Sequence, residues 1–140
     1  MPPHVRRAVL AVILAICLLL PACGPFGTAS RPPDGERWVL TTLYFGLSRP
    51  GGEVTPEEWR RFVDEVVTPR FKDGLTVFEA SGQWLDQRGI VVKEKTRVLV
   101  LLHPPGLKAD ELIDFIRARY KTLFQQESVL RTDQEVRVSF

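Results

Sequence analysis

An α+β fold is predicted for this chain, because four strand-like runs are interleaved with two segments of helical periodicity. The strand-like runs are rich in β-branched and aromatic residues and alternate from one position to the next. The helical segments instead repeat their apolar residues every three or four positions. With 140 residues, of which 44% are hydrophobic and 26% charged, the chain has the size of a single domain and is too apolar to be disordered.

The first strand and the first helix are predicted between residues 38 and 69. Residues 38–47 (WVLTTLYFGL) are typical of a strand. A helix is expected to begin after Thr55, with Pro56 at its first position and Glu58 completing a capping box. Pro69 is expected to end it. The apolar face of this helix consists of Trp59, Phe62, Val63, Val66 and Val67.

A hairpin, a second helix and a last strand are predicted in the remaining residues. Residues 75–85 and 90–102 form the hairpin around the turn 86–89, followed by a helix over 109–126 and a strand over 135–140. The inward side of this helix consists of Leu112, Ile113, Ile116, Tyr120, Leu123 and Phe124. The order βαββαβ is the ferredoxin-like arrangement, with two helices on one face of a four-stranded antiparallel sheet.

Strand alternation also predicts which side chains lie on the face of the sheet without helices. With Leu85 opposite Ile90, the residues facing the helices are Val39, Leu43, Phe45, Val77, Val98, Val100, Val136 and Val138. The open face then carries Leu40, Thr42, Tyr44, Phe78, Trp84, Lys95, Arg97, Arg137 and Ser139. Exposed aromatic patches mark interaction sites, and such faces bind RNA or a second sheet. Because export is predicted below, we expect no nucleic acid and a homodimer through this face.

Candidate site residues are few, because the sequence contains no nucleophile triad, phosphate loop or metal-ligand cluster. We therefore expect no metal and no cofactor. His103, the one histidine after the N-terminal segment, is interpreted as a turn or cap residue. Glu94 alternates with apolar neighbours and is either a general base or a cross-strand partner for a basic residue. The candidate binding or pocket residues are Tyr44, Trp84, Glu94, Arg97 and Tyr120.

Residues 1–22 are predicted to be a lipoprotein signal peptide. Arg6 and Arg7 precede an unbroken apolar run over 8–20, which is shorter than the about 20 residues of a membrane-spanning helix. Leu20-Pro21-Ala22-Cys23 resembles the lipobox of bacterial lipoproteins, in which the cysteine takes the lipid. Pro21 departs from the usual residue at its position. The alternative is cleavage near residues 27–29, which would release a soluble secreted protein.

Residues 23–37 are interpreted as the lipidated cysteine and a flexible tether, and 38–140 as a single domain. Without Arg6 and Arg7 the 19 basic residues fall to 17, equal to the 17 acidic residues, so the positive net charge belongs to the signal. We expect a membrane-anchored protein of the bacterial cell envelope, on the periplasmic side in a cell with two membranes. Cys17 would be removed with the signal, which excludes thiol catalysis in the domain.

An ordered series of short motifs covers nearly all of residues 38–140. The series is Thr42–Gly46, Pro69–Phe71, Gly74–Val77, Gly82–Trp84, Glu94-Lys95, Tyr120–Phe124, Gln126–Leu130 and Val138–Phe140. It resembles a family of short bacterial proteins, often named lipoproteins or secreted proteins, whose domain has no known function. The resemblance implies export and a single domain, and it assigns no catalytic residue.

Two functions follow from these observations. The first is a non-catalytic, lipid-anchored domain that binds a partner or itself in the envelope. The second is a small cofactor-free enzyme of the dimeric α+β barrel kind, with Tyr44, Trp84, Glu94 or Arg97 lining a pocket between helices and sheet. An enzyme predicts an enclosed cavity of about 300 Å³ or more, whereas a binding module predicts a flat apolar patch.

Overall fold

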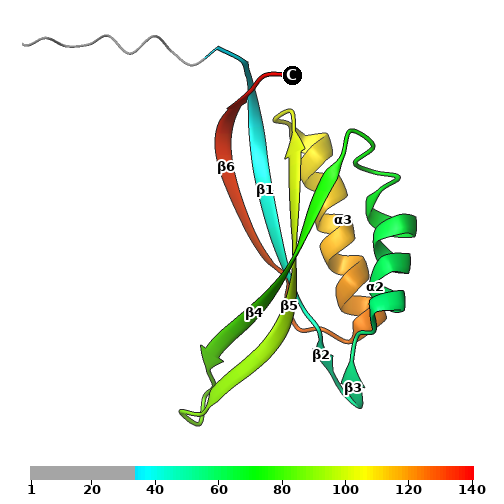
Figure 1. Ribbon diagram of the computed structural model, residues 1–140, viewed down its shortest axis with the longest axis vertical. Helices are drawn as coiled ribbons and strands as arrows, with labels where there is room; N and C mark the ends of the chain where they lie inside the picture. The colour runs from blue at the N-terminus through cyan, green and yellow to red at the C-terminus, as the bar shows by residue number, and fades with distance from the viewer. Residues whose placement is uncertain (1–33) are drawn as a thin grey trace, which may run out of the picture. The chain divides into compact units, whose positions relative to one another are not determined.

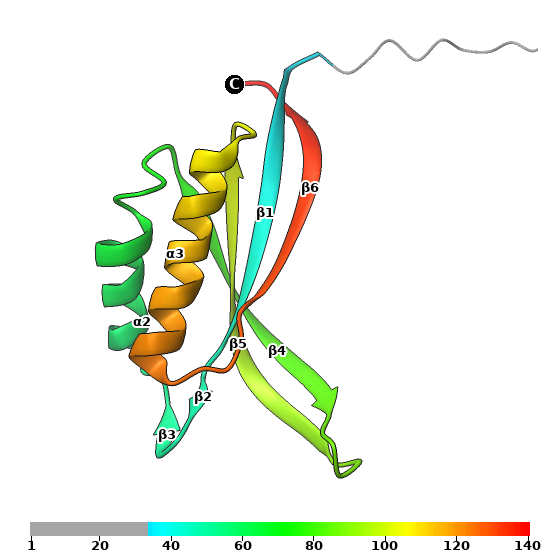
Figure 2. The ribbon, with the colours of Figure 1, turned by 180° about the vertical axis from the view of Figure 1, so that it is seen from behind.

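Four strands form one antiparallel sheet, in the order β4-β5-β1-β6, in the computed structural model, which describes residues 34–140. The strands are β1 (Glu36–Gly46), β4 (Leu75–Leu85), β5 (Val91–His103) and β6 (Leu130–Val138). The helices α2 (Pro56–Phe62) and α3 (Leu107–Phe124) lie on one side of this sheet, as Figures 1 and 2 show from opposite directions. The predicted ferredoxin-like α+β fold is therefore confirmed. The predicted signal, Cys23 and most of the tether lie outside the described residues.

The predicted elements are present, and three main differences separate them from the prediction. Strand β6 begins at Leu130, five residues before the predicted start, because polar residues such as Asp133 pair with β1 at the edge of the sheet. Helix α2 ends at Phe62 and continues as one π-helical turn, η1 (Val63–Val67). Two short strands that were not predicted, β2 (Ser48–Arg49) and β3 (Gly52–Glu53), form a small hairpin between β1 and α2.

The start of α2 agrees with the prediction in detail. The Thr55 side chain accepts a hydrogen bond from the Glu58 amide (3.2 Å), and the Glu58 carboxylate accepts one from the Thr55 amide (2.9 Å). Because an N-terminal cap satisfies amides that the helix cannot pair, this short helix has a defined starting point. Its direction places Trp59 and Phe62 against the sheet, where both are buried.

The core lies between the helices and the sheet, and aromatic rings dominate its centre. Phe45 packs edge-on against Tyr120 at 4.6 Å, against Trp59 at 5.2 Å and against Phe62 at 5.8 Å between ring centroids. Such edge-to-face pairs contribute about 0.5–1.5 kcal/mol each beyond the burial of area. The Tyr120 hydroxyl donates a hydrogen bond to the Gly46 carbonyl at 2.7 Å. Leu123, predicted to face inward, is 42% exposed.

The predicted register of the hairpin is wrong by one residue. Leu85 lies opposite Val91 instead of Ile90. The Asp86 side chain explains this shift, because its Oδ1 accepts hydrogen bonds from the amides of Arg88 and Ile90, both at 2.9 Å. Ile90 therefore belongs to the loop. Since side chains alternate along a strand, Leu99 and Leu101 face the helices and are fully buried.

The corrected register leaves the open face more apolar than predicted. Val98 and Val100 lie on it beside Phe78 and Thr76, and Val136 lies on it beside Trp38. Val138, in the alternating pattern of β6, lies on the same face. Conversely, the basic residues predicted there point to the other side of their strands: Lys95, Arg97 and Arg137.

A chain of polar side chains crosses the helix-facing side of the sheet at β1. The Thr41 hydroxyl, fully buried, donates to Asp133 Oδ1 at 2.6 Å and lies 2.9 Å from His103 Nε2. Arg131 Nε donates to the same carboxylate at 3.0 Å. Partial burial acts to raise the pKa of Asp133, but the hydrogen bonds from Thr41 and Arg131, together with the positive charge of Arg131, lower that pKa below its usual value.

We predict that Asp133 contributes stability that is lost at acid pH. A carboxyl whose pKa is lowered by folding stabilises the native state above its unfolded pKa of about 3.9 and loses this effect as the pH falls. Urea unfolding of the wild type and Asp133→Asn should therefore differ most near neutral pH and converge towards pH 3. Asp64→Asn, which removes an exposed carboxyl from η1, is the control and should show no such convergence. A difference that does not change with pH would contradict this role for Asp133.

We also predict that Tyr120→Phe lowers the free energy of unfolding by about 1–3 kcal/mol, because it leaves the Gly46 carbonyl without its donor while keeping the ring. Chemical denaturation monitored by circular dichroism measures the change. The matched control is Tyr44→Phe, since no residue of the described chain hydrogen-bonds to the exposed Tyr44 hydroxyl. An equal loss in both variants would mean that the hydroxyl bond to Gly46 has no special contribution.

Candidate functional site

A cleft of about 740 Å³ lies where the β4–β5 hairpin leaves the sheet. Pairing between β5 and β1 ends at Thr96 opposite Gly46. Beyond this point residues 81–94 of the hairpin, which we call the arm, extend away from the helices, as Figures 1 and 2 show. The cleft is bounded by the base of the arm, the end of β1 and the loops that follow β1 and α3.

Glu94 lines this cleft, and the glycine at position 46 explains how its side chain fits. The Glu94 side chain lies directly against Gly46, where an added Cβ would come within 2.5 Å of its carboxylate oxygen. Its Oε1 accepts a hydrogen bond from the Ser48 amide at 2.9 Å. The missing side chain at Gly46 therefore allows the carboxylate to lie on the end of β1, and Ser48 holds it there.

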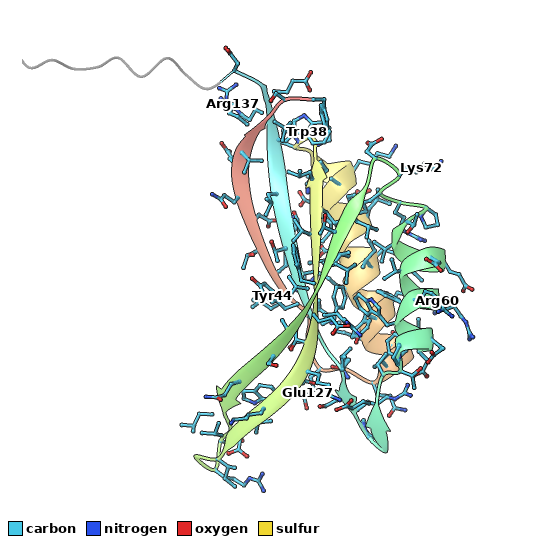
Figure 3. All side chains as sticks on the ribbon, in the orientation of Figure 1. Trp38, Tyr44, Arg60, Lys72, Glu127 and Arg137 are labelled. Carbon is cyan, nitrogen blue, oxygen red and sulfur yellow. The ribbon has the colours of Figure 1, made fainter. Side chains whose placement is uncertain are left out.

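Three of the five predicted site residues line the cleft. Tyr44 comes from β1, Trp84 from β4 and Glu94 from β5. Figure 3 shows Tyr44 on the side of the sheet away from α3. The cleft is thus on the open side of the sheet, whereas the enzyme alternative required a pocket between the helices and the sheet.

Tyr120 and Arg97 do not line the cleft. Tyr120 lies beneath it in the core, where burial and the nearby charge of Glu94 raise the pKa of its hydroxyl. Arg97 points to the helix side of β5 and forms an ion pair with Glu79. Its Nε is buried without a hydrogen-bond partner in the described part of the chain.

Sequence reasoning missed the loop residues that close the cleft. Gln126 follows Gln125, a left-handed residue (φ 54°) that ends α3, and its side-chain amide donates to the Ser48 carbonyl at 2.5 Å. Arg49 is occupied, because it pairs with Glu58 at 2.8 Å and lies over the Phe124 ring. These residues are distant in sequence and follow no periodic pattern, so no signal in the chain links them.

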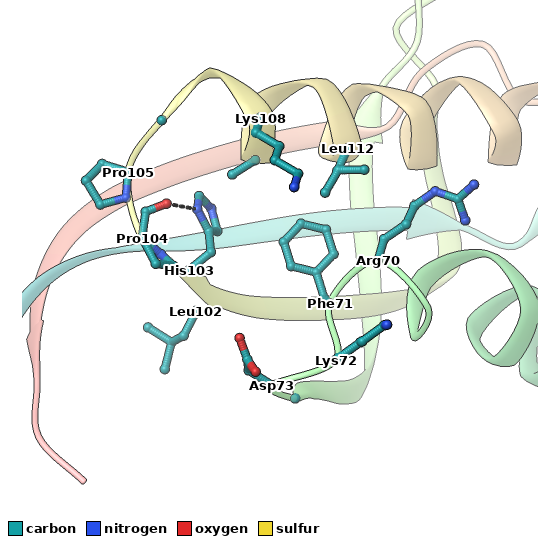
Figure 4. A pocket seen from close by; sticks show the side chains of 13 residues that line it. Arg70, Phe71, Lys72, Asp73, Leu102, His103, Pro104, Pro105, Lys108 and Leu112 are labelled. Carbon is teal, nitrogen blue, oxygen red and sulfur yellow. Dashed lines mark hydrogen bonds between the residues drawn. The ribbon is translucent and has the colours of Figure 1, made fainter.

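A second cavity, of about 380 Å³, lies at the opposite end of the sheet beside His103. Figure 4 shows Lys72 and Lys108 at this cavity and the hydrogen bond between His103 Nδ1 and the Pro104 carbonyl, which spans 2.9 Å. The other ring nitrogen is engaged by Thr41. Both ring nitrogens of His103 therefore have protein partners at the end of β5.

Two further properties of residues 34–140 bear on function. No three histidine, cysteine, aspartate or glutamate side chains in this range lie close enough together to hold a metal ion. No helix in the same range has the length and apolar character needed to cross a membrane.

Two solved structures share the fold at low sequence identity. A phage SAM lyase in complex with S-methyl-5'-thioadenosine aligns with a TM-score of 0.54 and 16% identity, covering 78% of this chain and 95% of the lyase. The periplasmic divalent cation tolerance protein CutA from Archaeoglobus fulgidus aligns with a TM-score of 0.51 and 9% identity, covering 74% of this chain and 87% of CutA. At these identities the likeness concerns the fold alone.

No curated protein matches the chain. Residues 40–140, however, match the model of a family described as "Protein of unknown function (DUF3574)". This match covers the ordered series of motifs from Thr42 to Phe140, and it spans all of the sheet except the first residues of β1. The chain therefore belongs to the DUF3574 family.

Proposed function

We propose that this protein is a lipid-anchored assembly domain of the bacterial envelope, which pairs with a second copy through the open face of its sheet. The proposed export rests on the N-terminal sequence, where Arg6 and Arg7 precede the apolar run 8–20. The anchor rests on Cys23, at the end of the lipobox-like segment. A diacylated cysteine inserts two long chains in the bilayer, at about 0.8 kcal/mol per buried CH₂.

The observation that carries the assembly proposal is a continuous apolar band across the open face. Phe78, Val98, Tyr44 and Leu130 are cross-strand neighbours, one from each strand of the sheet. Phe78 is 54% exposed, Tyr44 37% and Leu130 59%. Monomeric proteins rarely leave such a contiguous apolar surface in water.

The rows beside this band carry no charge. The next row along the sheet is Thr76, Val100, Thr42 and Thr132, and the one after it contains Leu102, Leu40 and Gln134. Depletion of charge at the centre of a surface patch distinguishes interfaces from other surface. An uncharged apolar face can pack against a copy of itself, and a two-fold symmetric contact between identical chains requires such a self-complementary surface.

The size of the available surface fits a pair of identical chains. Three strands over Trp38–Leu40 and four over Thr41–Tyr44, about 4.8 Å apart, present roughly 400 Å². The five paired rows of the arm and its base add roughly 160 Å² at the same spacing. Side chains make the accessible surface of this face larger than its projected area. The accessible surface therefore comes close to the roughly 800 Å² per partner of a standard interface.

The arm gives a second reason for a partner. Beyond Lys95, whose carbonyl accepts a hydrogen bond from the Leu47 amide, its strands pair only with each other, and a lone two-stranded ribbon is marginally stable in water. It nevertheless carries four exposed apolar side chains: Trp84, Leu85, Ile90 and Val91. A second copy packed on the open face would cover part of this apolar surface.

The alternative of a cofactor-free enzyme receives less support. The cleft around Glu94 is open to water, since Trp84 and Tyr44 at its walls are both exposed. An active site that transfers protons gains from excluding water. The other titratable candidate, His103, has both ring nitrogens engaged by Thr41 and Pro104.

We predict that a charge in the apolar band separates the copies. In a Cys23→Ser background, which avoids detergent, light scattering after size exclusion should give a dimer mass for the parent protein and a monomer mass for Phe78→Glu. Leu123→Glu, an equally drastic change at an exposed position of α3, should remain a dimer. A parent protein that stays monomeric at about 100 µM, well above the Kd of a standard interface, would contradict the proposal.

We predict that Cys23→Ser leaves the membrane fraction, because the residue that takes the lipid is lost. Ultracentrifugation of cell lysates and partition into detergent measure the distribution. Cys17→Ser is the matched control: it lies in the segment that export would remove, so the variant should stay with the membrane. Cys23→Ser protein that still sediments with membranes would contradict the lipid anchor.

A further inference from the structure

We propose that the cleft at the base of the arm binds an organic cation, a protonated amine or guanidinium on an apolar stem, with Glu94 as the counter-charge. One chain alone forms this cleft, so the site goes beyond the proposed self-association and does not depend on it. The inference rests on the geometry of Glu94, on the aromatic side chains beside it and on the charges around the cleft.

The Glu94 carboxylate is fixed in position but only partly satisfied. The Ser48 amide donates to Oε1 at 2.9 Å, and no residue among 34–140 donates to Oε2. An ionised carboxylate only accepts hydrogen bonds and has room for about four. Ser48 and the close approach at Gly46 already hold this side chain in one position. Binding of a hydrogen-bond donor would therefore cost little further conformational entropy of the Glu94 side chain.

Two aromatic residues from the neighbouring strands line the cleft together with Glu94. On this face of β5, Glu94 lies between Val92 and Thr96; Trp84 is opposite Val92, and Tyr44 is opposite Val98, the residue that follows Thr96 on the same face. The faces of tryptophan and tyrosine rings attract ammonium and guanidinium groups. The cleft therefore combines a carboxylate with two aromatic side chains, an arrangement suited to a cation with an apolar stem.

The basic residues near the cleft leave Glu94 without an opposite charge. Arg49 is paired with Glu58. Lys93 and Lys95 point to the other side of β5, where Lys95 pairs with Glu53 at 2.8 Å. Glu127 adds a second carboxylate to the lining, and Figure 3 shows it at the base of the arm. The charges therefore favour a cation and disfavour an anion.

The volume of about 740 Å³ lies within the roughly 300–1,000 Å³ of small-molecule sites. The same cation could arrive as a free amine or as an arginine or lysine side chain of a peptide. Agmatine, which carries an amine and a guanidinium on one short stem, represents the first source. An acetylated and amidated Gly-Arg-Gly peptide represents the second.

Isothermal titration of the membrane-purified protein in a non-ionic detergent tests the proposal. Agmatine, the peptide or both should bind, whereas succinate and neutral 1,4-butanediol should not. Glu94→Gln should weaken binding at least about tenfold, because it removes the charge from a charge-assisted hydrogen bond and keeps an oxygen for the Ser48 amide. Trp84→Leu should weaken it roughly threefold through the lost ring face.

Two control variants show whether the binding belongs to this cleft. Glu111→Gln removes a carboxylate from exposed α3 outside the cleft and should bind as the parent does. Phe78→Glu should also bind as the parent does, because Phe78 does not line the cleft; this keeps the test separate from self-association. The proposal is overturned if neither cation binds at millimolar concentration, if succinate binds as tightly, or if Glu94→Gln and Glu111→Gln behave alike.

Discussion

The core and the cleft of this protein meet at the backbone of Gly46. From the helix side, the Tyr120 hydroxyl donates to the Gly46 carbonyl at 2.7 Å. From the open side, the Glu94 carboxylate lies so close to the same residue that any Cβ would displace it. The next residue continues the ladder, since the Leu47 amide donates to the Lys95 carbonyl at 3.0 Å. The position of the arm relative to the core therefore depends on a residue without a side chain.

The two faces of the sheet differ in charge, because most of the charged side chains of its strands lie on the helix side. On the helix side, the charges at the sheet edge are satisfied by neighbours: Arg131 contacts Asp133 on its own strand and Asp110 on α3. On the open side, the central rows contain only apolar and uncharged polar residues. A sheet face that simply contacted water would carry alternating polar residues, as antiparallel sheets commonly do. The composition of this face therefore argues for a partner rather than for solvent.

The fold could be predicted from the sequence because periodicity and capping are local signals. The capping box at Thr55, the stripe from Trp59 to Val67 and the strand alternation in β1 all have their expected positions. The hairpin register could not be predicted, because it depends on a hydrogen bond from the Ile90 amide to the Asp86 side chain, which keeps Ile90 in the loop.

The same distinction applies to the candidate site. Strand alternation alone places Tyr44 and Trp84 on the open face, and both line the cleft. Glu94 is recognisable in the sequence as a charge among apolar neighbours. Its place on the open face, however, follows only from the register of β5, which also places Arg97 on the opposite face. Ser48 and Gln126 come from loops separated by many residues, and only the folded chain brings them together.

The two proposals place different demands on the same face of the sheet. Tyr44 and Leu130 belong both to the apolar band and to the lining of the cleft, whereas Glu94 lies two rows beyond the band, past Thr96 and Gly46. An unpaired charge out of water costs several kcal/mol, so we expect a second copy to cover the band and to leave the Glu94 carboxylate in contact with water. Because one chain alone forms the cleft, cation binding does not require the second copy, and self-association does not require the cation.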